Sequence, residues 1–122
     1  MDPENDPPPD RRNLKNKIMT IIGNSFSVDF GMAKAILHVD SETSLTFTII
    51  EKNGKEVHEV ETVTTEMTEL RPQLYMVTWK EKNGNTITQI QDYDHSIIYS
   101  NWTTPSGEFI HAKGTLTLST PK

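Results

Sequence analysis

The sequence predicts an all-β domain in which eight antiparallel strands, joined in up-and-down order, close into a barrel. Composition supports this first, because Thr, Val and Ile supply 33 of the 122 residues and Ala only 3. Such a bias favours pleated strands over helices. Seven turn signals then divide the chain beyond Gly23 into eight segments. They are Asp29-Phe30-Gly31, Asp40-Ser41-Glu42, Asn53-Gly54, Arg71-Pro72, Asn83-Gly84, Asp94-His95 and Pro105-Ser106-Gly107.

Apolar and polar residues alternate within these segments, as in strands that bury one face. The two clearest apolar sets are Leu45, Phe47 and Ile49, and Tyr75, Val77 and Trp79. Asn53-Gly54 and Asn83-Gly84 tolerate the positive φ angles of type I′ turns, so neighbouring strands should pair antiparallel. An immunoglobulin-like sandwich needs longer crossing connections, whereas a barrel uses tight ones and removes exposed edges. Which face points inward stays open, because both faces mix Thr with apolar residues.

The first 22 residues differ in composition from the rest. Residues 1–13 contain four prolines among acidic residues and asparagine, a composition that predicts a disordered tail. Residues 14–22 place apolar side chains near helical spacing, which favours a short helix that plugs or packs on the domain. A first strand is the competing interpretation. We expect the folded domain over residues 14–120.

Charge and hydropathy exclude several classes of protein. The formal net charge is −5 and the basic residues are scattered, so we expect no nucleic-acid partner. No apolar run approaches the length of a bilayer span or a signal-peptide core, so we expect no membrane association and a cytoplasmic protein. The absence of cysteine excludes disulfides and thiolate chemistry. The oligomeric state stays open, with a homodimer among the alternatives.

The segment from Leu70 to Thr88 carries a family likeness. In it, Pro72 is followed by the strand Tyr75-Met76-Val77-Thr78-Trp79-Lys80-Glu81, a turn that contains Gly84, and a strand that ends in Asp92. This arrangement resembles the MoaF-like family, and the likeness extends over roughly residues 20–119. The resemblance implies a lipocalin-like, or calycin-like, barrel. The family's name comes from a link to molybdenum-cofactor biosynthesis, which implies a role in cofactor or metabolite biosynthesis.

Trp79–Thr86 also resembles, more distantly, the Trp-x-Glu-x-x-Gly-Thr strand and turn of phenolic acid decarboxylases, with one extra residue before Thr86. This resemblance places the catalytic carboxylate of those enzymes at Glu81. Phe26 and Val28 replace their early paired tyrosines, and their arginine on an intermediate strand has no counterpart. We therefore do not expect decarboxylase activity, since a shared fold alone does not establish a reaction.

Tyr75, Trp79 and Glu81 lie on one face of one predicted strand. If that face lines the barrel, Tyr75 and Trp79 would form an aromatic wall for a ligand, and Glu81 would be a catalytic carboxylate. Desolvation inside the barrel would raise its pKa and suit it to proton transfer. The structural alternative is core packing for the rings and a solvated carboxylate beside the hairpin.

Two further candidates lie later in the chain. Asp92 ends its strand and is a second candidate acid or base, although a turn-capping role is the ordinary explanation. Tyr99 and Trp102 lie on opposite faces of the next strand, so at most one of them points inward. We take Tyr99 as the third ligand-binding aromatic.

The four histidines are far apart in sequence and form no metal-binding motif, so we expect no metal. The alternative is a metal site assembled across strands, since His38 shares a face with Asp40 and His58 with Glu56. The sequence contains no Gly-rich phosphate loop, and we expect no cofactor. An acidic stretch is interpreted as the exposed face of a strand. It comprises Glu56, Glu59, Glu61, Glu66 and Glu69.

The leading functional hypothesis is a barrel that binds a small, partly hydrophobic organic molecule by burial. The alternative is a cofactor-free lyase or isomerase that acts on a small metabolite, with Glu81 or Asp92 as acid or base. A third is a structural module whose barrel is filled by its own side chains. The sequence does not decide whether the protein is an enzyme.

Overall fold

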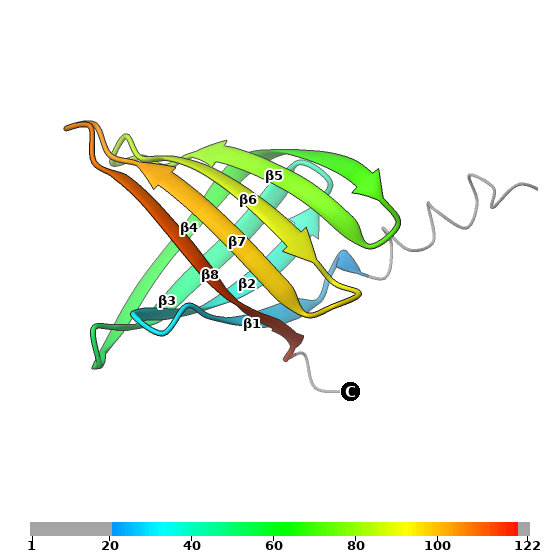
Figure 1. Ribbon diagram of the computed structural model, residues 1–122, viewed down its shortest axis with the longest axis horizontal. Coiled ribbons are helices and arrows are strands. Elements are labelled where there is room, and N and C mark those ends of the chain that lie inside the picture. Colours follow the sequence, from blue (N-terminus) through cyan, green and yellow to red (C-terminus); the bar gives the residue numbers. More distant parts are fainter. Residues whose placement is uncertain (1–20, 120–122) are drawn as a thin grey trace, which may run out of the picture.

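The computed structural model describes residues 21–119, which form a closed barrel of eight antiparallel strands (Figure 1). Each strand pairs with its neighbour in sequence, and the last pairs with the first from Phe26↔Leu118 to Asp29↔Thr115. The predicted fold class is confirmed. The strands are β1 (Ser25–Asp29), β2 (Ala33–Ser41), β3 (Ser44–Lys52), β4 (Lys55–Arg71), β5 (Leu74–Lys80), β6 (Thr86–Asp92), β7 (Ile97–Thr103) and β8 (Phe109–Leu118).

The predicted turns separate these strands, and one of them differs in form from the expectation. Asn53 and Gly54 have φ angles of 51° and 81°, which suit the expected two-residue type I′ turn. Asn83-Gly84 instead lies in a five-residue loop between β5 and β6, closed by a 2.8 Å hydrogen bond from the Glu81 N–H to the Asn85 carbonyl. This loop is longer than a two-residue turn because the backbone hydrogen bond between Glu81 and Asn85 lies beyond the ends of β5 and β6. Within the loop, Gly84 has a positive φ and Asn83 does not, whereas a type I′ turn needs two such residues.

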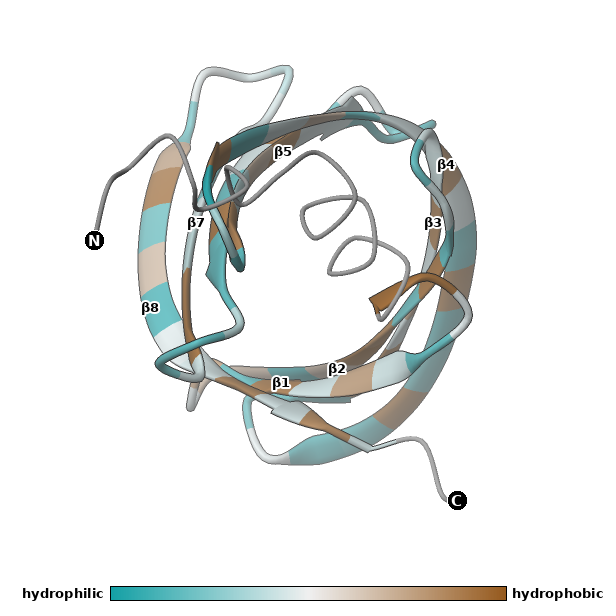
Figure 2. Cartoon of the chain, turned by 90° about the vertical axis from the view of Figure 1, so that its right-hand side faces the viewer, coloured by the Kyte–Doolittle hydropathy of each residue, from teal (hydrophilic) through white to brown (hydrophobic). Residues whose placement is uncertain are grey.

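The apolar faces of β1, β2, β3 and β5 point into the barrel. Figure 2, a view along the barrel, shows a ring of strands that alternate between hydrophobic and hydrophilic residues. Leu45 and Phe47 on β3 are buried, as are Tyr75, Val77 and Trp79 on β5. The two apolar sets found in the sequence therefore lie on the inner face.

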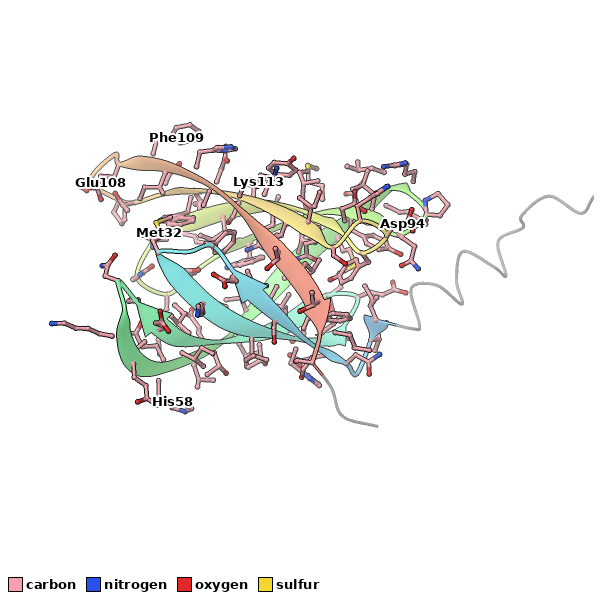
Figure 3. The ribbon with its side chains drawn as sticks, turned by 60° about the horizontal axis from the view of Figure 1, so that its bottom comes forward. Met32, His58, Asp94, Glu108, Phe109 and Lys113 are labelled. Atoms are coloured by element: carbon pink, nitrogen blue, oxygen red, sulfur yellow. The ribbon has the colours of Figure 1, made fainter. Side chains whose placement is uncertain are left out.

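The two ends of the barrel differ. Hairpins after β2, β4 and β6 form the packed end, where the ring of Tyr93 contacts those of Phe26 and Tyr75 at centroid distances of 4.9 and 5.9 Å. Ile21 is buried in the same core cluster. Hairpins after β1, β3, β5 and β7 form the opposite end, which we call the mouth. Figure 3 labels Met32 and Glu108 on two of the mouth hairpins and Asp94 at the packed end.

The seam between β1 and β8 depends on a glycine. A Cβ atom at Gly114 would overlap the carbonyl oxygen of Asp29 and would lie 2.9 Å from Cδ1 of Phe30. The absence of a side chain there lets the two strands approach closely enough to close the cylinder.

The expected tail over residues 1–13 and most of the expected helix over residues 14–22 lie outside the described residues. Within residues 21–119, no helix is long and apolar enough to cross a membrane.

Candidate functional site

The mouth opens into a cavity of about 470 Å³ inside the barrel. Residues from seven of the eight strands and from two mouth hairpins line it, because every second residue of a strand faces the lumen. The hairpins of the mouth are tied in pairs: the Asn53 N–H donates to the Met32 carbonyl at 2.7 Å, and Gly84 lies against Pro105. The rim of the cavity is thus held by contacts between hairpins.

Aromatic rings form much of the cavity wall. Trp79 on β5 stacks on Phe47 on β3, with a centroid distance of 6.2 Å and an interplanar angle of 29°. The ring centroid of Trp102 on β7 lies 6.3 Å from that of Phe30, which follows β1. Two ring pairs, one between β5 and β3 and the other between β7 and the β1–β2 hairpin, therefore face a space wide enough for an organic guest.

Glu81 lies at the mouth and lines the cavity, next to Trp79. The indole Nε1–H of Trp79 donates to Glu81 Oε2 at 3.2 Å, and the amide Nδ2 of Asn85 donates to Glu81 Oε1 at 3.4 Å. Burial, followed by the negative charge of Glu61, raises the pKa of Glu81. The two hydrogen bonds and the charge of Lys52 oppose that rise without cancelling it.

Part of the acidic stretch on β4 lines the cavity, contrary to the expectation of an exposed face. Glu59 and Glu61 are among the lining residues, and Glu69 holds a buried carboxylate oxygen deeper in the barrel. The odd-numbered glutamates share the inward face of Val63. Glu59 pairs with Lys52 at 2.8 Å, and Glu61 accepts a 2.8 Å hydrogen bond from the Lys82 N–H.

A chain of polar side chains runs along the inside of the barrel to the cavity floor. The Tyr93 hydroxyl donates to Gln91 Oε1 at 2.7 Å, and Gln91 Nε2 donates to Gln89 Oε1 at 2.8 Å. Gln89 Nε2 then donates to Ser100 Oγ at 3.4 Å. Gln89 and Ser100 line the cavity, whereas Gln91 lies below it and is fully buried.

The other sequence-predicted residues lie away from this cavity. Tyr75 is fully buried at the packed end, and burial, aided by the charge of Glu69, raises its pKa to about 12. Tyr99 points outward, is 37% exposed and stacks on His111. Trp102, not Tyr99, is the inward aromatic of β7.

Asp92 lies at the packed end, where it caps the hairpin that follows β6. Its Oδ1 accepts hydrogen bonds from the N–H groups of Asp94 and His95, and its Oδ2 lies 3.0 Å from His95 Nδ1. Burial raises the pKa of Asp92, but these hydrogen bonds and the charge of His95 outweigh it and hold the pKa below its usual value. The structure therefore brings Trp79 and Glu81 together and separates both from Tyr75, Tyr99 and Asp92.

No group of three or more metal-ligating side chains gathers within the described part of the chain.

The sequence analysis also missed the cavity residues Gln89 and Ser100, of which only Gln89 could have been found from the sequence pattern. Gln89 alternates with Ile87 and Gln91 on β6, so period two alone places all three on one face. Ser100 had no such signal, because serine is common on either face.

Comparison with known proteins identifies the family and the fold. The model of the MoaF-like family matches residues 22–117, which confirms the likeness seen between Leu70 and Thr88. Among thirteen similar chains in solved structures is a protein from Burkholderia vietnamiensis described as "a putative beta-lactamase". It has a TM-score of 0.74 and 19% sequence identity, over 81% of this chain and 95% of that one. At this identity the likeness shows the fold alone. No curated protein matches.

Proposed function

Because the chain belongs to the MoaF-like family and folds into a closed barrel that is hollow at one end, we propose that it binds a small, partly hydrophobic organic molecule in the cavity. The observation that carries this proposal is the cavity itself, about 470 Å³ and walled by Trp79, Trp102, Phe47 and Phe30. Its volume lies within the range typical of small-molecule sites.

Burial of apolar surface supplies the affinity. A guest of naphthalene size that loses about 250 Å² of apolar surface to the walls gains about 6 kcal/mol at 25 cal/mol per Å². This gain is an upper bound on the binding free energy, because the guest loses translational and rotational freedom when it binds. Polar groups of the lining then decide which guests bind, because an apolar wall discriminates weakly between molecules of similar size.

A blocked cavity tests the proposal. Ala35 on β2 lines the cavity, and the next residue, Ile36, lies on the outer face. We expect Ala35→Trp to abolish both a guest that copurifies in native mass spectrometry and quenching of tryptophan fluorescence by naphthalene probes. Ile36→Trp, the matched control, should leave both signals unchanged. Equal binding by the two variants would refute binding in the barrel.

The position of Glu81 favours a second candidate function, a cofactor-free lyase or isomerase. A carboxyl with a raised pKa at a partly desolvated cavity wall suits proton transfer to or from a small metabolite. This proposal rests on Glu81 alone, since Asp92 lies at the other end of the barrel. In turnover assays on candidate metabolites, Glu81→Gln should abolish activity and Asp92→Asn should retain it. A Glu81→Gln protein with full activity would exclude this function.

A further inference from the structure

We propose that the guest binds in one orientation, with an uncharged hydrogen-bond acceptor such as a ketone or amide carbonyl against Ser100 and Gln89 at the cavity floor. This inference rests on the proposed binding function and names the chemical class of the guest. It follows from the direction of the interior hydrogen bonds and from the position of charge around the cavity.

The interior chain of hydrogen bonds points toward the cavity. Each link from Tyr93 through Gln91 to Gln89 donates to the next group, and the last link donates to Ser100 Oγ. Within residues 21–119, Gln89 Nε2 and Ser100 Oγ have each other as their one hydrogen-bond partner. Because an amide nitrogen carries two hydrogens and a hydroxyl carries one of its own, each group keeps a hydrogen to donate to a guest. Both side chains are more than nine-tenths buried, with exposed fractions of 2% and 5%.

Buried donors without acceptors cost free energy, so a site that keeps them suits a guest that supplies an acceptor. Gln89 and Ser100 lie directly opposite each other in the β6–β7 register, and Ile87 and Trp102 form the next opposed pair toward the mouth. The cavity therefore has a polar floor beneath an apolar layer. A guest with an apolar body and one terminal acceptor matches that order.

The charges around the cavity exclude an anionic inner group. Among the described residues of the lining, the cations are Lys52 and Lys82, which lie at the end of β3 and in the β5–β6 loop, both at the mouth. Lys52 is already paired with Glu59. A carboxylate at the floor would be desolvated without a counter-ion, whereas a neutral carbonyl needs only the two donors.

Two naphthalene probes test this orientation. One is 6-propionyl-2-(dimethylamino)naphthalene, whose ketone accepts hydrogen bonds and whose emission shifts to the blue when that bond is lost. The other is 2-(dimethylamino)naphthalene, which has the same apolar body without the ketone. Both are titrated against the wild type, Ser100→Ala and Thr65→Val. Thr65 is the matched control, because its buried hydroxyl faces the barrel interior outside the cavity lining.

We expect Ser100→Ala to weaken binding of the ketone probe roughly fivefold to tenfold, in line with the loss of one buried hydrogen bond. The bound ketone should also emit further to the blue, which separates a lost hydrogen bond from a general loosening of the fold. The ketone-free probe should bind Ser100→Ala as it binds the wild type, and Thr65→Val should change neither probe.

Two different failures can be told apart. If both probes bind and Ser100→Ala changes neither the relative affinity nor the emission, the orientation is refuted and the binding function stands. If neither probe binds the wild type, both proposals fall.

Discussion

Replacing Tyr93 by Phe tests whether the interior hydrogen-bond chain stabilises the barrel. Phe keeps the ring that contacts Phe26 and Tyr75 and removes only the hydroxyl that donates to Gln91. Tyr75→Phe is the matched control in the same layer. Its hydroxyl is buried and has no hydrogen-bond partner within residues 21–119.

The expected effects differ in size and sign. Tyr93→Phe leaves the Oε1 atom of a fully buried Gln91 without a donor, which costs about 2 kcal/mol of unfolding free energy. For a domain of about 100 residues that lowers the melting temperature by roughly 10 °C. Tyr75→Phe removes a desolvated hydroxyl that makes no hydrogen bond. We therefore expect the unfolding free energy not to fall, and to rise by up to about 1 kcal/mol.

Equilibrium urea unfolding, followed by the fluorescence of Trp79 and Trp102, measures both effects. Comparable denaturant slopes would show that the variants unfold from similarly compact states. A Tyr93→Phe protein within about 0.5 kcal/mol of the wild type, or equal losses in both variants, would refute the assigned role of the chain.

Three further predictions concern the mouth and the seam. Burial raises the pKa of Glu81, so its contribution to stability is full below its unfolded pKa and is lost as pH rises through the folded pKa. Glu81→Gln should therefore gain stability over the wild type as urea midpoints are followed from about pH 4 to pH 7, and an unchanging difference would contradict this. Gly114→Ala should cost about 2–3 kcal/mol in urea unfolding, because the new methyl group overlaps the Asp29 carbonyl; a loss under about 0.5 kcal/mol would contradict the close approach. Trp79→Leu should weaken binding of the ketone probe about tenfold, whereas the outward Tyr99→Ser should leave it unchanged; the reverse order would refute the assigned wall.

The barrel could be predicted from the sequence because its determinants are local. Turn residues such as Asn53-Gly54 fix where strands end, and period-two alternation fixes which residues share a face. Tight connections then leave few topologies other than the up-and-down barrel. The inward direction of the face that holds Tyr75 and Trp79 required the structure, since Thr occupies both faces.

The candidate site was only partly predictable, because two residues on the same face of a strand can lie at opposite ends of the barrel. Tyr75 and Trp79 are four residues apart on β5, which separates them by about 13 Å along the strand. One lies at the packed end and the other at the cavity. Glu61 was assigned to solvent because acidic residues are seldom buried. Its inward position follows from the alternation of β4, which in this instance was a better guide than charge.

The separation of a packed end from a hollow end has a consequence for how such barrels diversify. The hairpins after β1 and β5 line the cavity, and those after β3 and β7 contact them at the mouth. Tyr93, Phe26 and Ile21 pack at the far end. Insertions or substitutions in the rim hairpins therefore leave the aromatic cluster untouched. Relatives with this architecture could acquire new ligands through changes in these hairpins while the same distant core keeps the cylinder folded.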